Sequence, residues 1–253
     1  MIEVFGIPGF AFAGLMASFL AGGLVKGMIG FGLPLVVVSL APLFTEVGVF
    51  LAANAVVMPF SNAMQVYQGG PPRPTVTRFR GLFAVMLITL PLGVLAAGSV
   101  TPETLMLILG LVVMGFTALQ AANPRLMIAP RHEGPAGLLT GALAGLIGGL
   151  TTVNGPIITL FAVGTALERR VMISLQGVAF LLSGLVLTIG YAGIGILDSG
   201  RVLTGLACIL PAWAGMWLGN RLAARIPQAL FRRIVLAVLF VAGGNLVFRA
   251  LGG

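Results

Sequence analysis

The sequence predicts an all-α polytopic membrane protein built from two inverted repeats, each a broken, re-entrant helical segment followed by three transmembrane helices. Three observations lead to this fold class: the composition, the spacing of the apolar runs and a similarity between the two halves. Hydrophobic residues make up 58% of the 253 residues and charged residues only 8%, whereas a soluble domain carries about 25% charged residues. The mean hydropathy of +1.12 agrees with this contrast. An ordinary soluble globular protein is therefore excluded.

The apolar runs give the number and the lengths of the predicted segments. A bilayer core takes roughly 20 residues for each helical crossing, and most of the runs are close to that length. Short connections separate them, so neighbouring segments are expected to be neighbours in space. The eight runs span residues 5–44, 47–68, 82–100, 104–122, 137–164, 171–197, 202–220 and 234–248.

Two of the runs are expected to contain a break. As one helix the first run would extend about 60 Å, twice the bilayer core. Its predicted break is Gly27–Pro34, with Gly32 near the N-cap and Pro34 in the first turn of the returning arm. The fifth run is expected to break within Thr151–Pro156, with Asn154 as the N-cap. Each arm of the fifth run would then have about 10 to 12 residues and span half a membrane.

The two halves of the chain resemble each other. An offset of 118 residues places Gly27–Gly30 on Gly145–Gly148, and an offset of 122 matches polar residues around the second and sixth runs. These matches predict a first repeat at 1–122, a connecting loop at 123–136 and a second repeat at 137–253. By the symmetry of the repeat, the two breaks are expected to meet near mid-membrane. The further matches are Glu46 with Glu168, Asn54 with Gln176, Ser61 with Ser183, Pro91 with Pro211 and Pro102 with Pro227.

The arginines in the connections favour inverted halves. If the fifth run crosses the membrane once, these arginines divide seven against six between the two faces, which carries no orientation signal. If the run returns to its own side, the division becomes eleven against two, as the positive-inside rule requires. The larger group is Arg73, Arg78, Arg80, Arg125, Arg131, Arg169, Arg170, Arg221, Arg225, Arg232 and Arg233, and the smaller is Arg201 and Arg249.

The two breaks are the predicted binding site. A half-helix that begins inside a membrane directs backbone N–H groups and a partial positive charge at what lies before it, which suits an anion. Glycines allow the backbone to approach a ligand, and neutral side chains add hydrogen-bond donors. The alternative is that the glycines serve helix packing and the polar residues cap or join helices. The candidate substrate-binding residues are Lys26, Gly30, Gly32, Asn54, Ser61, Gly148, Gly149, Thr151, Thr152, Asn154, Gln176 and Ser183.

Lys26 is the single charge well inside an apolar run, and it allows two interpretations. Because Lys26 lies directly before the glycine-rich break, its ammonium group could neutralise part of a substrate's charge. Alternatively, it ends a first full crossing and extends its ammonium group to the membrane interface.

Several classes of function are excluded by what the sequence lacks. All six acidic residues fall at termini or in connections, so neither a buried carboxylate relay nor a cation pathway is expected. No catalytic motif or metal-ligand spacing is present, so we expect neither an enzyme nor a metal or cofactor site. The net charge of +8 comes from scattered residues, which suit membrane topology better than nucleic-acid binding. The expected partners are a small anion and the lipid bilayer.

The pattern around the breaks resembles the TauE/SafE family of sulfite and organosulfonate transporters. The resemblance lies in the glycines of Gly27–Gly32, the run Gly141–Gly149 leading to Asn154–Pro156, and the Pro-x-x-Leu helix starts at Pro102 and Pro227. It covers essentially the whole chain. One departure is Leu33–Pro34, where the family's first copy usually has a further glycine.

The resemblance implies movement of small sulfur-containing anions such as sulfite, sulfoacetate, taurine or a related C2 sulfonate. We expect a multi-pass protein of the bacterial inner membrane that works by alternating access, through motion of one repeat-derived unit against another around the site. Two other functions remain open from the residues. The same helix termini would suit a carrier of carboxylates or other small anions, and glycine motifs used for packing alone would suit a non-transporting membrane scaffold or assembly protein.

Overall fold

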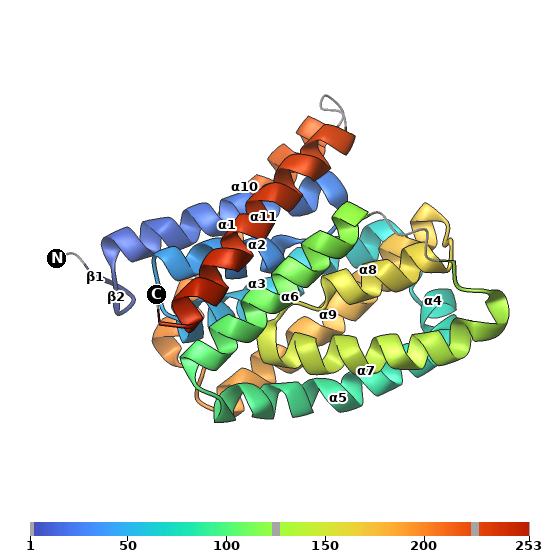
Figure 1. Cartoon of the computed structure of the whole chain (residues 1–253), viewed down its shortest axis with the longest axis horizontal. Coiled ribbons are helices and arrows are strands. Elements are labelled where there is room, and N and C mark those ends of the chain that lie inside the picture. Colours follow the sequence, from blue (N-terminus) through green and yellow to red (C-terminus); the bar gives the residue numbers. More distant parts are fainter. Residues whose placement is uncertain (1–2, 123–126, 224–227, 253) are drawn as a thin grey trace. The chain divides into compact units, whose positions relative to one another are not determined.

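The computed structural model describes residues 3–122, 127–223 and 228–252 (Figure 1). The secondary structure of the described chain consists of helices and one short antiparallel hairpin of β1 (Glu3–Val4) and β2 (Ile7–Pro8). Seven of the described helices are long and apolar enough to cross a membrane, which agrees with a polytopic membrane protein. These helices are α1 (Gly9–Ile29), α3 (Val47–Gly69), α5 (Arg80–Ser99), α6 (Pro102–Ala122), α7 (Glu133–Thr151), α9 (Arg169–Gly193) and α10 (Ser199–Ala223).

The remaining helices are shorter or less uniformly apolar. Helix α11 (Gln228–Ala250) contains a shorter apolar stretch at Val235–Ala250. The others are α2 (Leu33–Leu40), α4 (Arg73–Arg78), α8 (Gly155–Gly164) and the 3-10 turns η1 (Ala41–Leu43) and η2 (Pro130–His132).

Both predicted breaks are confirmed. Helix α1 ends at Gly30 (φ 86°), and α2 begins after Gly32 (φ 101°) with a proline in its first turn. Helix α7 ends at Thr152 (φ 63°), and α8 begins after Asn154, again with a proline in its first turn. Positive φ angles suit glycine and are rare for β-branched residues, so Thr152 stands out.

Of the two arms predicted for the fifth run, the first is longer than expected. Helix α8 has 10 residues as expected, but α7 has 19 and extends about 28 Å. The glycines of α7 do not interrupt the helix. Three of them, Gly141, Gly145 and Gly149, lie so close to α5 that a larger side chain would displace it.

Each break reverses the chain into a helical hairpin. A Cβ atom added at Gly22 of α1 would lie 2.9 Å from the Leu33 carbonyl oxygen of α2, and the Phe44 ring occupies the space beside Gly14. In the second hairpin, the Ile128 N–H, just before α7, donates to the Gly164 carbonyl at the end of α8 (2.7 Å). The open ends of this hairpin therefore lie together.

The described helices form two compact units, and neither unit is one half of the sequence. Unit 1 contains Met1–Val57, Val100–Pro124 and Ile196–Gly253, and unit 2 contains Met58–Ser99 and Arg125–Gly195. Each unit combines segments from the predicted halves 1–122 and 137–253. The compact units and the sequence repeat are thus different divisions of the chain.

Glycines bring helix backbones together within each unit. In unit 1, α1 packs on α10, where Cβ atoms at Gly23 and Gly27 would meet the carbonyls of Ala212 and Met216. In unit 2, α5 and α7 run side by side (Figure 1). There, Cβ atoms at three glycines spaced four apart on α7 would meet carbonyls of α5; these glycines are Gly141, Gly145 and Gly149.

The residues of the two hairpins match each other at a single offset in residue number. An offset of 122 residues relates the packing glycines Gly23 and Gly145, and also the left-handed residues Gly30 and Thr152. It relates the residues before the short helices too, Gly32 and Asn154. The expected offset of 118 residues does not match the breaks, because it joins Gly30, which ends a helix, to a glycine inside α7.

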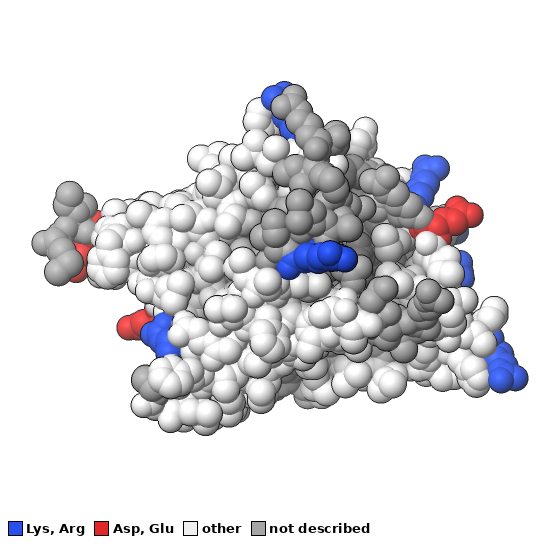
Figure 2. Space-filling view, turned by 45° about the horizontal axis from the view of Figure 1, so that its top comes forward, with Lys and Arg blue, Asp and Glu red and all other residues white. Residues whose placement is uncertain are grey.

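Charged side chains are sparse on the described surface. Figure 2 shows one face of the molecule, on which the few blue and red residues interrupt a largely uncharged surface. Exposed residues of the described helices include large apolar side chains such as Ile88, Ile189 and Leu210. Lipid tails would cover such side chains in a bilayer.

Candidate functional site

The break between α7 and α8 gathers buried polar side chains in unit 2. Thr151, Thr152 and Asn154 are at most 2% exposed. The Thr152 N–H donates to the Gly148 carbonyl (2.8 Å), which closes the last turn of α7. The Thr151 hydroxyl donates to the Ile147 carbonyl (2.6 Å) and accepts from the Val153 N–H (3.2 Å). The predicted site residues of this break therefore lie together.

Asn154 holds the N-cap position of α8, but its side chain makes no capping hydrogen bond. Its Nδ2 donates instead to the Ser183 hydroxyl of α9 (2.7 Å), and that hydroxyl donates to Met86 Sδ of α5 (3.7 Å). The expectation that Asn154 caps the helix is right in position and wrong for the side chain. One short chain of polar contacts thus joins α8, α9 and α5.

A second contact fixes α8 to α9. Gln176 Nε2 donates to the Thr159 hydroxyl (2.9 Å), and that hydroxyl donates to the Gly155 carbonyl within α8 (2.7 Å). Gln176 and Ser183 are seven residues apart and share one face of α9, as predicted. Both side chains hold α8 in place, so the interpretation of these residues as helix-joining groups is supported for the contacts described. Their contact with a substrate remains a prediction.

The glycines before the break have packing roles. A Cβ atom at Gly148 would lie 2.9 Å from the Asn154 Cβ atom. A Cβ atom at Gly149 would meet the Leu90 carbonyl of α5, and the Gly149 carbonyl accepts from the buried Tyr191 hydroxyl (2.9 Å). Close packing therefore explains both glycines without a ligand, and their predicted binding role is untested.

The α7–α8 break lies near the middle of the long helices around it. Ser183 is close to the midpoint of α9, and Met86 is about one turn from the midpoint of α5. The polar contacts of Asn154 therefore place the beginning of α8 at mid-length of two helices that are long enough to cross a membrane.

The α1–α2 break of unit 1 is placed differently. A Cβ atom at Gly27 would lie 3.0 Å from the Asn220 N atom, in the last turns of α10. This break is therefore near the end of α10, not at its middle. Its expected position near mid-membrane stays a prediction. Lys26 is only 5% exposed, so its burial favours an inward side chain over one that extends to solvent.

The other predicted site residues lie on α3. Asn54 is fully buried in the part of α3 that belongs to unit 1. Ser61 is also buried, in the part that belongs to unit 2, and its hydroxyl donates to the Met58 carbonyl of its own helix (3.2 Å). The predicted site residues are thus divided between the two units.

Helices α2 and α8 differ in the charge at their N-termini from several long helices, although the long helices α1 and α5 also begin without an acidic residue. Several long helices begin at an acidic residue, as α10 does where the Asp198 carboxylate accepts from the Arg201 N–H (2.9 Å). Helices α2 and α8 begin at Gly32 and Asn154, with no acidic residue in the first turn. The acidic residues at or directly before other helix starts are Glu46, Glu103, Glu133, Glu168 and Asp198. The dipoles of α2 and α8 are therefore not offset by a carboxylate at their own starts.

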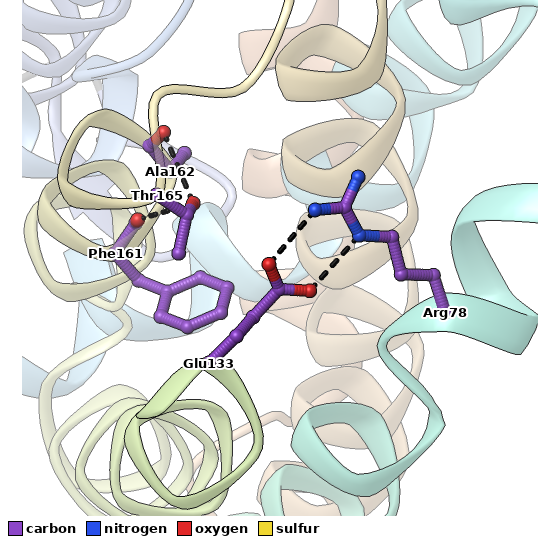
Figure 3. A network of polar contacts seen from close by, with 5 residues as sticks. All are labelled: Arg78, Glu133, Phe161, Ala162 and Thr165. Carbon is purple, nitrogen blue, oxygen red and sulfur yellow. Dashed lines mark hydrogen bonds and ion pairs between the residues drawn. The ribbon is translucent and has the colours of Figure 1, made fainter. Parts of the chain in front are cut away.

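An ion pair between Arg78 and Glu133 lies at the open end of the α7–α8 hairpin (Figure 3). Arg78 donates two hydrogen bonds to Glu133, of 2.9 and 2.8 Å, so α4 is tied to the first residue of α7. The hydrogen bonds that Arg78 donates to the Glu133 carboxylate raise the pKa of Arg78 above its ordinary value. Nearby, the Thr165 hydroxyl donates to the Phe161 carbonyl (2.8 Å), and the Phe161 ring meets the Phe79 ring edge-on at 5.7 Å.

Three residues of this site were not predicted from the sequence: Met86, Thr159 and Tyr191. Each is part of the contacts that hold the break. Tyr191 offered a signal, because it is one of two tyrosines and lies within an apolar run. Met86 offered none, since its role depends on a serine 97 residues away. Within the described residues, no cluster of three or more His, Cys, Asp or Glu side chains is placed to hold a metal ion.

Comparison with known proteins gave one match. The family model described as "Sulfite exporter TauE/SafE" matches residues 15–246, which include both hairpins and all seven candidate membrane-spanning helices apart from the first turns of α1. No curated protein and no solved structure matches the chain.

Proposed function

Because the chain belongs to the sulfite exporter TauE/SafE family, we propose that it transports sulfite or a C2 organosulfonate such as sulfoacetate or taurine. The family implies an exporter-type membrane transporter of sulfur-containing anions, not an enzyme. The seven apolar helices together with the family indicate a multi-pass membrane protein. The proposal adds the substrate, the binding site and a location in the bacterial inner membrane.

The observation that carries the proposed site is the start of α8. It lies at mid-length of α5 and α9, among buried neutral polar groups, with no carboxylate at its N-terminus. A helix N-terminus provides N–H donors and a partial positive charge, and both suit a sulfur oxyanion. Thr151, Thr152 and Asn154 are the nearest side chains able to add hydrogen bonds. We propose Lys26, Gly30, Gly32 and Asn54 as the corresponding group at the α1–α2 break.

The proposed topology rests on the two hairpins. If each returns to the side where it began, the arginines of the connections divide eleven against two, which places the larger group in the cytoplasm. The halves are then inverted, as in many transporters that work by alternating access. The bond between Ile128 and Gly164 supports the return of the second hairpin.

The test of the proposed function is stabilisation of the purified protein by anions. Sulfite, sulfoacetate, taurine, acetate and sulfate are compared by their effect on the melting temperature. We expect at least one sulfur anion to raise it, because a ligand at a hundred times its Kd stabilises a folded protein by about 2.7 kcal/mol. Stabilisation by acetate alone would indicate a carboxylate carrier, and no stabilisation by any anion would indicate a scaffold.

Asn154→Asp tests the site itself. The substitution keeps the size of the side chain and an acceptor near Ser183, but it places a carboxylate at the start of α8, so we expect the stabilisation by the sulfur anion to disappear. The matched control is Thr140→Val, since Thr140 is a buried polar residue of α7 more than three turns before the break. Stabilisation that persists in Asn154→Asp would place the anion elsewhere.

A further inference from the structure

Helix α3 is shared by the two compact units. It is continuous from Val47 to Gly69, but the boundary between the units falls inside it, between Val57 and Met58. Pro59 lies two residues beyond this boundary, inside the helix. A proline cannot donate the backbone hydrogen bond to the residue four before it, and its ring crowds that residue's carbonyl. The helix is therefore weakest where the two units divide it.

Close packing fixes the first half of α3 to unit 1. A Cβ atom at Gly205 of α10 would lie 2.7 Å from the Val56 Cβ atom. Near the start of α3, a Cβ atom at Gly48 would lie 3.2 Å from the guanidinium of Arg201, also in α10. The half of α3 before Pro59 thus has α10 as its partner.

The second half of α3 packs with equal closeness on a different helix. A Cβ atom at Gly184 of α9 would lie 2.8 Å from both Met58 Cβ and Pro59 Cδ. Two turns earlier on α9, a Cβ atom at Gly177 would lie 2.9 Å from the Val66 N atom. The half of α3 from Met58 onward thus has α9, in unit 2, as its partner.

The other described links between the units lie outside helices or at their ends. One passes from Ser99 to Val100, between α5 and α6, and another from Gly195 (φ 77°) to Ile196, between α9 and α10. Among the described helices, α3 alone passes from one unit into the other. A change in the orientation of the units therefore has to bend or displace α3, whereas the connections adapt by rotating backbone dihedrals.

We propose that α3 is the hinge of the transporter and that it bends at Pro59 when the two units change orientation. The inference rests on the proposed function, because alternating access is what requires such a motion. Pro59 lowers the resistance to bending by removing one helical hydrogen bond, and the glycine contacts make each half of α3 follow its own unit. Pro59 is a positioning residue in this mechanism and touches no substrate.

The test compares the three prolines that lie inside described helices. Pro59→Ala restores the missing N–H donor and should stiffen α3. Pro91→Ala and Pro211→Ala make the same chemical change in α5 and α10, each of which lies within one unit, and serve as matched controls. The variants are reconstituted in liposomes, and the exchange of radiolabelled sulfite is measured beside the stabilisation by sulfite.

We expect Pro59→Ala to slow exchange by about fivefold or more, the effect of one net hydrogen bond on a rate. The stabilisation of Pro59→Ala by sulfite should equal that of the unaltered protein. Pro91→Ala and Pro211→Ala should exchange sulfite at the rate of the unaltered protein. Ordinary exchange in Pro59→Ala, or equal slowing in all three variants, would overturn the hinge and leave the proposed function intact.

A second measurement needs no transport. Spin labels attached through thioether bonds, since sulfite cleaves disulfides, are placed at the exposed residues Thr77 of unit 2 and Asn220 of unit 1 in a Cys208→Ala background. Pro59→Ala should narrow the distance distribution between the labels, whereas Pro59→Gly, which leaves α3 flexible, should keep it broad. An unchanged distribution in Pro59→Ala would overturn the hinge even if no sulfur anion is transported.

Discussion

Tyr191 holds the last turn of α7 through a single hydrogen bond. Its hydroxyl donates to the Gly149 carbonyl at 2.9 Å, and the side chain is fully buried. Tyr191→Phe removes the donor and leaves the carbonyl without this bond, so we expect a loss of about 1 to 3 kcal/mol of stability. The loss should appear as a lower melting temperature and as weaker stabilisation by the sulfur anion, because the end of α7 leads directly into the proposed site.

The other tyrosine of the chain provides the control. Tyr67 is 84% exposed near the end of α3, so Tyr67→Phe should change neither the melting temperature nor the stabilisation by the anion. Equal effects of the two substitutions would show that the Tyr191 hydroxyl does not support the break.

At the level of single residues, the sequence predicts positions better than roles. The order of glycine, asparagine and proline places Gly32 and Asn154 before the short helices, since these residue types favour such backbone positions. The partner of the Asn154 side chain could not be predicted, because Ser183 lies 29 residues further along the chain. The strained conformation of Thr152 was not predictable either, since its residue type disfavours a positive φ angle.

At the level of helices, α5 and α7 can pair closely because glycines of α7 have no side chain at the contact. A Cβ atom at Gly145 would overlap the Thr89 hydroxyl and lie 2.6 Å from the Met86 carbonyl. Gly145→Ala should therefore separate the two helices and cost about 1 to 3 kcal/mol, the usual effect of overpacking. The measurement is the midpoint of unfolding in a titration with a denaturing detergent.

Gly115 of α6 is the matched control for this substitution. It also lies inside a helix, but nothing within 4 Å would meet an added Cβ atom. Gly115→Ala should leave the unfolding midpoint unchanged or raise it, because alanine favours helix by up to about 1 kcal/mol over glycine. A lower midpoint in both variants would mean that glycine is needed in these helices for a reason other than close packing.

The helix lengths show where reasoning from sequence fails for such a chain. Glycine lowers helix propensity in isolation, so the glycines of α7 suggested a short first arm. In the folded protein the helix continues through these residues, and three of them, Gly141, Gly145 and Gly149, pack closely on α5. Such packing offsets a low helix propensity in membrane helices.

At the level of the whole molecule, the membrane class and both breaks were predictable, and the pairing of helices was not. Composition and run length depend on the chain alone, whereas the pairing of α1 with α10 joins residues almost 190 positions apart. Glycines spaced four residues apart occur in α1, α7 and α10 alike, so this pattern does not specify which helix meets which. Units that combine both halves of the sequence could therefore be found only from the structure.

The last prediction concerns the side of the membrane on which the second hairpin ends. Met127 and Glu168 are exposed residues before α7 and after α8, and Ser199 is exposed at the start of α10. If the hairpin is re-entrant, single cysteines at Met127 and Glu168 in a Cys208→Ala background should react with a membrane-impermeant maleimide from one side. A cysteine at Ser199 should react from the other, because α9 crosses the membrane between Glu168 and Ser199.

The three labelling positions separate the alternatives without reference to transport. Arg225 is predicted to lie on the same face, but it is outside the described residues. Thr77 is therefore the additional labelling position, because it is exposed and lies next to the Arg78–Glu133 ion pair. It should react from the same side as Met127. A single crossing by α7 and α8 would instead place Met127 and Glu168 on opposite sides. That result would contradict inverted halves, because the arginines would again divide seven against six and no positive-inside signal would remain.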